Sequence, residues 1–531
     1  MDSLVPGPIA TALDLLVTLF VFVIGLGVAV VIVLFIVDIT QNRDAIRRNY
    51  PVVGRFRYLF STLGEFFRQY FFAMDREEMP FNRAERQWVS RASAGKDNTV
   101  AFGSTKNLTV PGTLYFVNCP FPTLDTDRAE TEPMVIGPTC RKPYAAPSFF
   151  NISGMSYGAL SKPAVQALSK GAGMAGCWLN TGEGGVSPFH LEGDCDIVFQ
   201  IGTAKYGVRD AEGNLSDERL KALGDEPRIK MFEIKLSQGA KPGKGGILPA
   251  IKVSEEIAAI RGIPAGKDSI SPNRHPDISS VADLLDRIAH IREVTGKPVG
   301  FKCVIGAYGW LDAMFKEVAR RGTESAPDFI TVDSGDGGTG AAPLPLMDNV
   351  GLPIRESLPL VDDIRKRHGM KERVRLIASG KMITPAGVAA SLCSGADFVV
   401  AARGFMFALG CIQSLKCNKN TCPTGITTHN PRLQRGLDPT EKAVRVANYC
   451  INMRKEVEII AHSCGVPEPR RLRRFHVRIV GDDGRSMPLN ELFPSPDPAD
   501  NDPAAAASAA TKQRDHVEAE NPGDTLVPEQ A

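Results

Sequence analysis

The sequence has almost no net charge. Its 62 lysine and arginine residues are offset by 60 aspartate and glutamate residues, which leaves +2 over 531 residues. A chain so evenly balanced has no general electrostatic attraction for a nucleic acid, so no nucleic-acid partner is expected. Hydrophobic residues make up 43% of the chain, which is enough for one very large domain or for two to three ordinary ones.

The sequence also lacks the cysteine density of a secreted disulfide scaffold. Its 11 cysteines are an odd number spread through a long chain. Secreted scaffolds are shorter and richer in cysteine, so this usage favours a reducing compartment. Only Cys411, Cys417 and Cys422 lie close together in the sequence.

These three cysteines predict a metal or redox cluster, because soft thiolates suit an iron–sulfur cluster or zinc. Structural zinc sites usually combine four ligands with short C-x2–4-C pairs. The spacing here is C-x5-C-x4-C, and His429 is the candidate for a fourth ligand. Pro423 directly after the last cysteine is more typical of a cluster that lacks a fourth iron. The alternative is three unrelated buried thiols.

Charge is absent altogether from residues 15–37, an apolar run long enough to cross a bilayer. No lysine or arginine precedes this run and no small-residue cleavage site follows it, which argues against a cleaved signal peptide. Arginines follow it on the C-terminal side only, at Arg43, Arg47, Arg48, Arg55 and Arg57. The positive-inside rule therefore predicts a single-pass membrane protein whose main body is cytoplasmic.

The aromatic stretch 58–74 comes soon after these arginines, and two interpretations of it stay open. It is either an amphipathic helix along the membrane surface or a helix packed on the globular domain.

After Ser148, short apolar runs alternate with helical stretches, a pattern that predicts a parallel α/β sheet. The runs are 149–153, 177–180, 231–236, 299–304, 329–332, 375–378 and 398–401. Seven runs without two-half symmetry favour a (β/α)8 TIM barrel over an open sheet. An eighth strand is expected between Asn180 and Met231.

The predicted domains follow from these patterns. Residues 1–40 form the transmembrane anchor, 41–140 a juxtamembrane and lead-in region, and 141–465 the barrel with the cysteine loop. Residues 466–495 form a C-terminal extension. Residues 496–531 are rich in Pro, Ala and Asp and are predicted to be disordered.

Polar residues follow the predicted strands, where the active face of such a barrel lies. Lys241 could bind a substrate carboxylate as a point charge, and Glu183 or His275 could transfer protons. Gln238 belongs to the same loops. For each of the four, the alternative is an ordinary solvated loop residue.

Two late loops suit a phosphate group. Ser379-Gly380 and Arg403-Gly404 each follow a predicted strand, and backbone N–H groups at the next helix would bind the phosphate. Ordinary strand-to-helix turn chemistry is the alternative. Lys302 lies in an apolar run and is expected to point into the barrel, where a fixed cation would stabilise a reduced flavin. Its alternative role is a structural ion pair with Asp333.

Motifs over residues 141–436 together resemble the FMN-binding synthase domain of glutamate synthases. The matching strings are GMSYGALS (154–161), NTGEGG (180–185), QGAKPGKGG (238–246), HPDI (275–278), FK (301–302), DGGTGA (336–341) and GCIQSLKCNKNTCPTG (410–425). The apolar N-terminal segment and RKPY (141–144) are similar to the layout of stand-alone, membrane-anchored glutamate synthase-related proteins of bacteria.

The resemblance implies FMN, a 3Fe–4S cluster and reductive amination of 2-oxoglutarate or a related 2-oxo acid by hydride from reduced FMN. Cys411, Cys417 and Cys422 would ligate the cluster. Glu183 and Lys241 would be catalytic, and Gln238, Lys241 and His275 would bind the substrate. FMN would be held by Met155, Ser156, Gln200, Lys302, Gly337, Gly338, Ser379, Gly380, Arg403 and Gly404.

Two departures from the family pattern bear on these assignments. The phosphate-loop motif is altered to SGKMITPAG (379–387), and the chain does not begin with the catalytic cysteine of a glutaminase domain. Ammonia or an amine is therefore expected from elsewhere. The electron donor is expected to be separate, either a ferredoxin, a reductase subunit or a membrane donor. A homo-oligomer stays open.

Two other functions also stay open. A (β/α)8 barrel hosts many chemistries, so an FMN-dependent oxidoreductase with a different substrate is one alternative. A non-catalytic membrane-linked electron carrier is the other.

Overall fold

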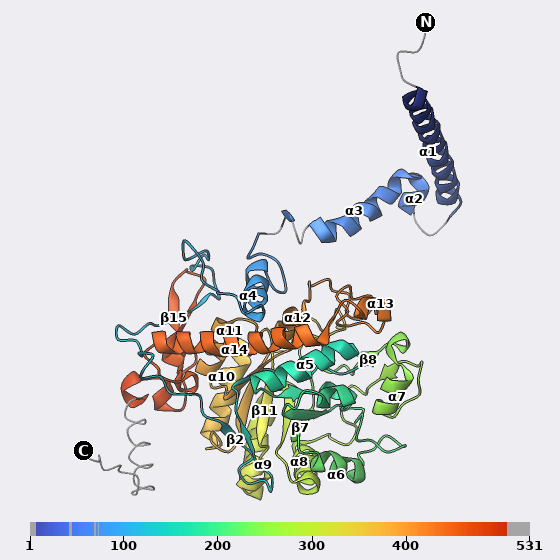
Figure 1. Ribbon diagram of the computed structural model, residues 1–531. Helices are drawn as coiled ribbons and strands as arrows, with labels where there is room; N and C mark the ends of the chain where they lie inside the picture. The colour runs from blue at the N-terminus through green and yellow to red at the C-terminus, as the bar shows by residue number, and fades with distance from the viewer. Residues whose placement is uncertain (1–6, 42–44, 68–70, 73, 507–531) are drawn as a thin grey trace, which may run out of the picture. The chain divides into compact units, whose positions relative to one another are not determined.

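The computed structural model describes residues 7–41, 45–67, 71–72 and 74–506. The chain divides into two compact units, Met1–Ala84 and Glu85–Ala531. Each unit has its own internal organisation, drawn in Figure 1.

The described part of the first unit contains the helices α1 (Gly7–Thr40), α2 (Ala45–Asn49) and α3 (Val53–Phe67). Within α1, Thr11–Thr40 is long and apolar enough to cross a membrane, and its most apolar stretch is not buried in the protein. Asp38 near the end of α1 is fully buried and forms ion pairs with Arg47 at 2.8 Å and with Arg55 at 2.7 Å. These pairs tie α2 and α3 to the C-terminal end of α1.

The second unit is built on a closed parallel barrel with the strand order β4-β5-β6-β7-β10-β11-β12-β13, and β13 pairs with β4. The strands are β4 (Phe150–Ile152), β5 (Leu179–Asn180), β6 (Ile197–Ile201), β7 (Ile229–Lys235), β10 (Val299–Val304), β11 (Phe329–Asp333), β12 (Arg375–Ser379) and β13 (Phe398–Ala401). The predicted TIM barrel is confirmed, and β6 is the strand that was expected between Asn180 and Met231.

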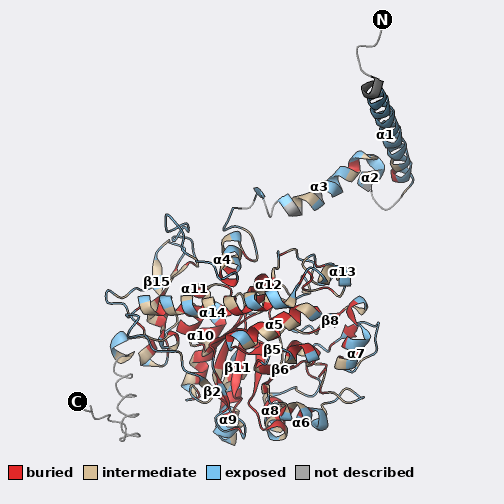
Figure 2. Cartoon of the chain, viewed as in Figure 1, coloured by how far each residue is buried: buried red, intermediate tan, exposed pale blue. Residues whose placement is uncertain are grey.

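Helices surround the barrel, and Figure 2 shows the buried strands inside the more exposed helical layer. The helices after the strands are α5 (Lys162–Ala175), α6 (Asp217–Asp225), α8 (Val281–Thr295), α9 (Gly309–Arg321), α10 (Ile354–Arg367), α11 (Pro385–Cys393) and α12 (Arg403–Leu409). Others are α4 (Arg83–Ser93), α7 (Glu255–Arg261), α13 (Pro431–Gln434), α14 (Pro439–Ser463) and α15 (Leu489–Leu492). The long α14 lies against α5 and α12.

An apolar cluster fills the end of the barrel where the strands begin. A hairpin of β2 (Met134–Ile136) and β3 (Tyr144–Ala146) contributes to it, together with Trp178, Phe329 and Phe398. The Tyr144 hydroxyl donates to Asp196 at 2.9 Å, which fixes the hairpin to the barrel. With this end packed, the opposite end is left for polar groups.

The C-terminal extension pairs with the lead-in region rather than forming a separate module. Strand β14 (Val477–Val480) lies antiparallel between β1 (Leu114–Phe116) and β15 (Ser486–Pro488). A further short hairpin, β8 (Ile247–Leu248) with β9 (Ser269–Ile270), stands in the long connection after β7.

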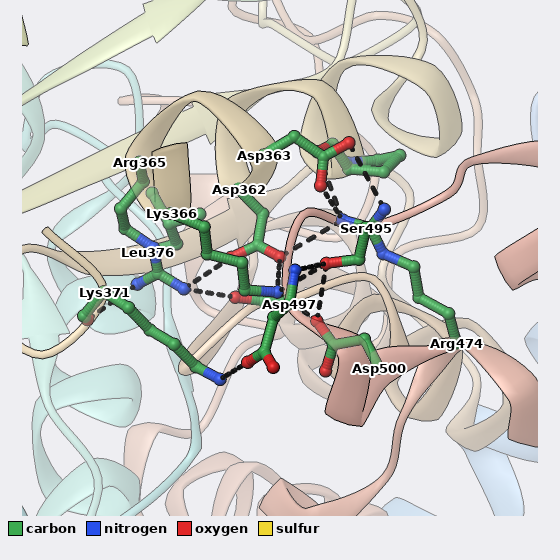
Figure 3. A network of polar contacts seen from close by, with 12 residues as sticks. Asp362, Asp363, Arg365, Lys366, Lys371, Leu376, Arg474, Ser495, Asp497 and Asp500 are labelled. Atoms are coloured by element: carbon green, nitrogen blue, oxygen red, sulfur yellow. Dashed lines mark hydrogen bonds and ion pairs between the residues drawn. The ribbon is translucent and has the colours of Figure 1, made fainter. Parts of the chain in front are cut away.

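The boundary predicted for the disordered tail, residue 496, lies too early in the chain, because the structure describes residues up to 506. Asp500 is buried and pairs with Lys366 of α10, while Asp497 pairs with Lys371 at 3.0 Å (Figure 3). Arg474 joins the same network through Asp362 and Asp363. These charge pairs order the segment despite its composition, because they supply attraction that the missing apolar side chains cannot. The rest of the predicted tail, residues 507–531, lies outside the described residues.

Candidate active site

A cleft of about 300 Å³ lies among the loops that follow β5, β6 and β7. Glu183, in a short 3-10 turn after β5, and Lys235, the last residue of β7, face each other in it. Lys235 Nζ and Glu183 Oε2 are 3.0 Å apart. Gln238 and Lys241, from the loop after β7, also line the cleft. The structure therefore brings Glu183, Gln238 and Lys241 together.

The charges in this cleft influence one another. Burial raises the pKa of Glu183, but the positive charges of Lys235 and Lys241 outweigh it and lower the pKa overall. Burial, reinforced by the positive charge of Lys235, lowers the pKa of Lys241. The cleft thus holds an ionised carboxylate between two ammonium groups, an excess of positive charge that suits an anionic ligand.

His275 is placed differently from the other three candidates. Its ring is buried and does not line the cleft. The ring Nε2 lies 3.0 Å from the backbone oxygen of Lys235. Burial lowers the pKa of His275 to about 4, so the ring is neutral near pH 7. The contact fixes the main chain from which the Lys235 side chain extends.

Lys235 itself was missed by the sequence analysis. It is the last residue of a strand whose preceding residues are buried, and this position alone does not distinguish a cleft lysine from a solvated one. The signal available in the sequence was its place at the carboxyl end of a barrel strand.

Lys302 points into the barrel, as predicted. Its Nζ lies 3.3 Å from Asp333 Oδ2 and donates to Ser379 Oγ at 3.4 Å. The backbone N–H of Gly239 donates to the same Asp333 oxygen at 2.9 Å. Burial raises the pKa of Asp333, but Lys302 and this N–H lower it overall. The ion pair that was considered as an alternative is therefore present.

Beside Lys302, the barrel holds a polar cavity of about 230 Å³. The buried Glu233 accepts hydrogen bonds from Gln200 Nε2 at 2.7 Å, from Asn180 Nδ2 at 2.9 Å and from Thr331 Oγ1 at 2.5 Å. Glu233 and Asn180 were not singled out from the sequence, because each reads as one polar residue in an apolar strand. Together with Lys302 and Gln200 they give this end of the barrel one lysine ammonium group, one carboxyl group and two oriented amides.

Gly154, in the loop after β4, permits this loop to approach the Asn180 and Gln200 amides closely. A Cβ at Gly154 would lie 2.8 Å from Asn180 Oδ1 and 2.9 Å from Gln200 Nε2. The candidate residues Met155 and Ser156 follow directly and are half-buried at the barrel mouth. The backbone of this loop is thereby held against the polar cavity.

The candidate phosphate loops come from neighbouring strands, because β11, β12 and β13 are adjacent in the barrel. A Cβ at Gly338 would lie 2.7 Å from Arg403 Nε, so these two candidates are in contact. Gly380 has a φ of 121°, and its Cβ position lies 2.3 Å from Ser334 Cβ. A Cβ at Gly337, in the same loop as Gly338, would lie 2.8 Å from the Ser334 backbone oxygen. Ser379 is buried between these loops.

Gly404 has a packing reason for lacking a side chain. A Cβ there would lie 2.2 Å from the Tyr449 hydroxyl of α14. The glycine therefore lets α12 approach α14, whatever else the loop binds.

Cys411, Cys417 and Cys422 lie in the irregular loop that follows α12. Burial raises the pKa of Cys411 to about 11, and the nearby Cys417 and Cys422 add to the shift. Among the residues that the structure describes, no three His, Cys, Asp or Glu side chains converge tightly enough for a single metal ion. The three cysteines therefore do not form such a group, and their role as cluster ligands stays a prediction.

A family model for a conserved region in glutamate synthase matches residues 114–467. This chain belongs to the glutamate synthase family. The glutamate synthase large subunit-like protein YerD of Bacillus subtilis is 39% identical over 90% of this chain and 98% of its own length. An archaeal glutamate synthase (NADPH) of Methanocaldococcus jannaschii is 36% identical over 62% of this chain and 61% of its own. A glutamate synthase large subunit-like protein of Rhizobium meliloti is 33% identical over 61% of this chain and 73% of its own.

Family membership agrees with the resemblance found in the sequence, and the matched region covers the whole barrel and the cysteine loop. The roles of the individual site residues remain predictions.

Proposed function

We propose that this chain is a glutamate synthase-type oxidoreductase that reductively aminates 2-oxoglutarate or a related 2-oxo acid. The reaction joins the oxo acid and ammonia with two electrons and two protons, and releases an amino acid and water. The observation that carries the proposal is the cleft in which Lys235 and Lys241 place two ammonium groups around Glu183. Such a site suits a small carboxylate that must also exchange protons.

Each cleft residue has a separate task in this proposal. Lys241 binds a carboxylate of the oxo acid, and the Gln238 amide donates a hydrogen bond to it. Glu183 is held by Lys235 and transfers protons at the nitrogen that is being added. His275 acts indirectly, through its contact with the Lys235 main chain. The named relatives support this substrate class, since their names include glutamate synthase.

The residues at the barrel mouth fit FMN. Lys302, Gln200, Met155 and Ser156 would hold the flavin ring, and the Lys302 ammonium group would supply a positive charge that stabilises the reduced flavin. The phosphate would be held by Gly337, Gly338, Ser379, Gly380, Arg403 and Gly404. Cys411, Cys417 and Cys422 would hold a 3Fe–4S cluster. When bound, FMN would supply a hydride and the cluster would supply single electrons.

The nitrogen and electron sources are proposed to be separate molecules. Ammonia or an amine would enter the cleft from solution, and a ferredoxin, reductase subunit or membrane donor would reduce the cluster. We propose that α1 is a retained anchor and that the barrel is cytoplasmic, since arginines such as Arg47 and Arg55 follow α1.

The purified full-length protein in detergent tests this function. Its visible and EPR spectra report the flavin and the cluster, and anaerobic dithionite reduces both. Adding 2-oxoglutarate with ammonium should reoxidise the flavin and produce one glutamate per flavin, measured by mass spectrometry. Lys241→Gln should slow reoxidation while leaving the flavin bound.

The outcome that contradicts the proposal is a reduced flavin that no 2-oxo acid reoxidises with any amine. Reoxidation by another class of substrate would instead indicate a different oxidoreductase on the same barrel.

A further inference from the structure

Lys252 is a buried lysine that contacts the cysteine loop from a distant part of the chain. It ends a short 3-10 turn, Ala250–Lys252, in the connection after β7. Only 2% of the residue is exposed. Its Nζ donates to the backbone oxygen of Cys417 at 2.8 Å and to that of Thr427 at 2.6 Å. One ammonium group therefore joins two points of the loop that carries the cysteines.

No carboxylate balances this charge within the part of the chain that the structure describes. The buried Lys302 and Lys205 do have such a partner, Asp333 and Asp277, whereas the buried Lys297 donates to two backbone oxygens as Lys252 does. Both acceptors of Lys252 are neutral backbone oxygens, so its hydrogen bonds hold the ammonium group in place without supplying a negative charge.

A buried cation without a counter-charge is unfavourable, and it becomes favourable when an anion is bound beside it. Three cysteine thiolates and an iron–sulfur core carry net negative charge, and reduction by one electron adds one more. A fixed positive charge at short range stabilises the reduced form more than the oxidised form. Lys252 is itself buried, which limits the screening of its charge by water.

We propose that Lys252 is the built-in counter-charge of the iron–sulfur cluster and holds its reduction potential high enough to accept electrons. It is a positioning residue, because it contacts the cluster loop and no reacting atom. The inference rests on the cluster assigned under the proposed function. It adds that the loop after β7, which also supplies Gln238 and Lys241 to the substrate cleft, tunes the electron entry site.

The test compares three variants of the full-length protein in detergent. Lys252→Gln removes the charge but keeps an amide that can donate to the loop carbonyls. Lys252→Arg keeps the charge. Lys267→Gln removes a charge from an exposed position in the same connection and is the matched control. Iron and sulfide analysis, flavin content and thermal melting establish that each variant is folded and loaded.

The reduction potential is then measured by EPR-monitored redox titration. Lys252→Gln should lower the equilibrium constant for one-electron reduction tenfold or more, which corresponds to a shift of about 59 mV to more negative potential. Lys252→Arg and Lys267→Gln should stay close to the wild type. Loss of the cluster from Lys252→Gln alone, with flavin content and melting unchanged, would also support the proposal.

A loaded Lys252→Gln protein with the wild-type potential would overturn the proposal. So would loss of the cluster from both Lys252→Gln and Lys252→Arg, because shape and not charge would then matter. If Lys252→Gln does not fold, Lys252→Met replaces it, and a wild-type potential in that variant would overturn the proposal equally. A wild-type protein without iron would instead contradict the cluster itself, so the two failures are distinguishable.

Discussion

At the scale of single residues, the cleft depends on charges that shift one another. Glu183 is kept ionised by two lysines, and Lys241 is made easier to deprotonate by burial and by Lys235. Neither shift is visible in the sequence, because Lys235 and Glu183 are far apart along the chain. The two lysines need Glu183 between them, since two buried ammonium groups alone would repel each other.

The lowered pKa of Lys241 predicts an alkaline limit to substrate binding. As the pH rises through this pKa, Lys241 becomes neutral, and KM for the 2-oxo acid should rise at a lower pH than an ordinary lysine would give. Glu183 raises the pKa of Lys241. Glu183→Gln should therefore move the alkaline loss of substrate binding to still lower pH, a shift measured as Kd for 2-oxoglutarate over a pH series, since this variant also lacks the proposed proton-transfer group.

Removing the Lys241 charge should abolish the alkaline limb of the pH profile. Lys241→Gln is expected to lower kcat/KM roughly 30-fold, because a hydrogen bond to a charged group contributes about 2 kcal/mol. The exposed Lys221→Gln on α6 is the control and should leave the kinetics unchanged. An unaltered pH profile in Lys241→Gln would show that another group sets the limb.

At the scale of elements, the C-terminal extension is held to α10 by buried charge pairs. Lys366 contacts both Asp362 and Asp500, and Arg474 contacts Asp362 and Asp363 (Figure 3). The pairs lie at the boundary between barrel and extension. The pairs Lys366–Asp500 and Lys371–Asp497 form only when residues 497–500 are in place.

Two truncations should separate the ordered part of the tail from the rest. Removal of residues 507–531 should leave thermal stability unchanged. Removal of residues 496–531 deletes Asp497 and Asp500 and leaves Lys366 with one partner fewer. It should lower the free energy of unfolding by about 3 kcal/mol, as breaking buried pairs does. Equal melting temperatures for the two truncated proteins would contradict the role given to these aspartates.

Helix α3 allows the two interpretations of the aromatic stretch to be tested. Phe60 and Phe56 are exposed on one face, and Thr62 lies on another. If this face lies on a bilayer, tryptophan in Phe60→Trp should be quenched by brominated lipids in nanodiscs, and tryptophan in Thr62→Trp should be quenched less. Equal, weak quenching of both would favour packing on protein instead.

At the scale of the whole molecule, the barrel unit has its own closed sheet and core. Removal of residues 1–74 leaves α4 and all of the barrel intact. The shortened protein should keep its flavin and melt within a few degrees of the full chain. It should be found in the soluble fraction and no longer in the membrane fraction. Sedimentation, flavin absorbance and thermal melting would measure this. A flavin-free or insoluble product would show that the first unit is needed for folding.

Much of the fold followed from local patterns. Apolar runs of strand length, helical stretches between them and turn residues at their ends predicted the barrel. Thr384 followed by Pro385 is a local sequence pattern typical of a helix start, and Thr384 does accept a hydrogen bond from the Gly387 N–H at the start of α11. The closely spaced cysteines and the polar loops likewise mark the ends of elements that can be read from neighbouring residues.

Tertiary structure alone decided which distant residues meet. It paired Lys235 with Glu183, placed Lys252 beneath the cysteine loop and ordered Asp500 against Lys366. The physical reason is that periodicity and turn chemistry act over a few residues, whereas these contacts are brought together by closure of the barrel. The sequence by itself determined the barrel and the loops at its active end, and closure of the sheet determined the charges within them.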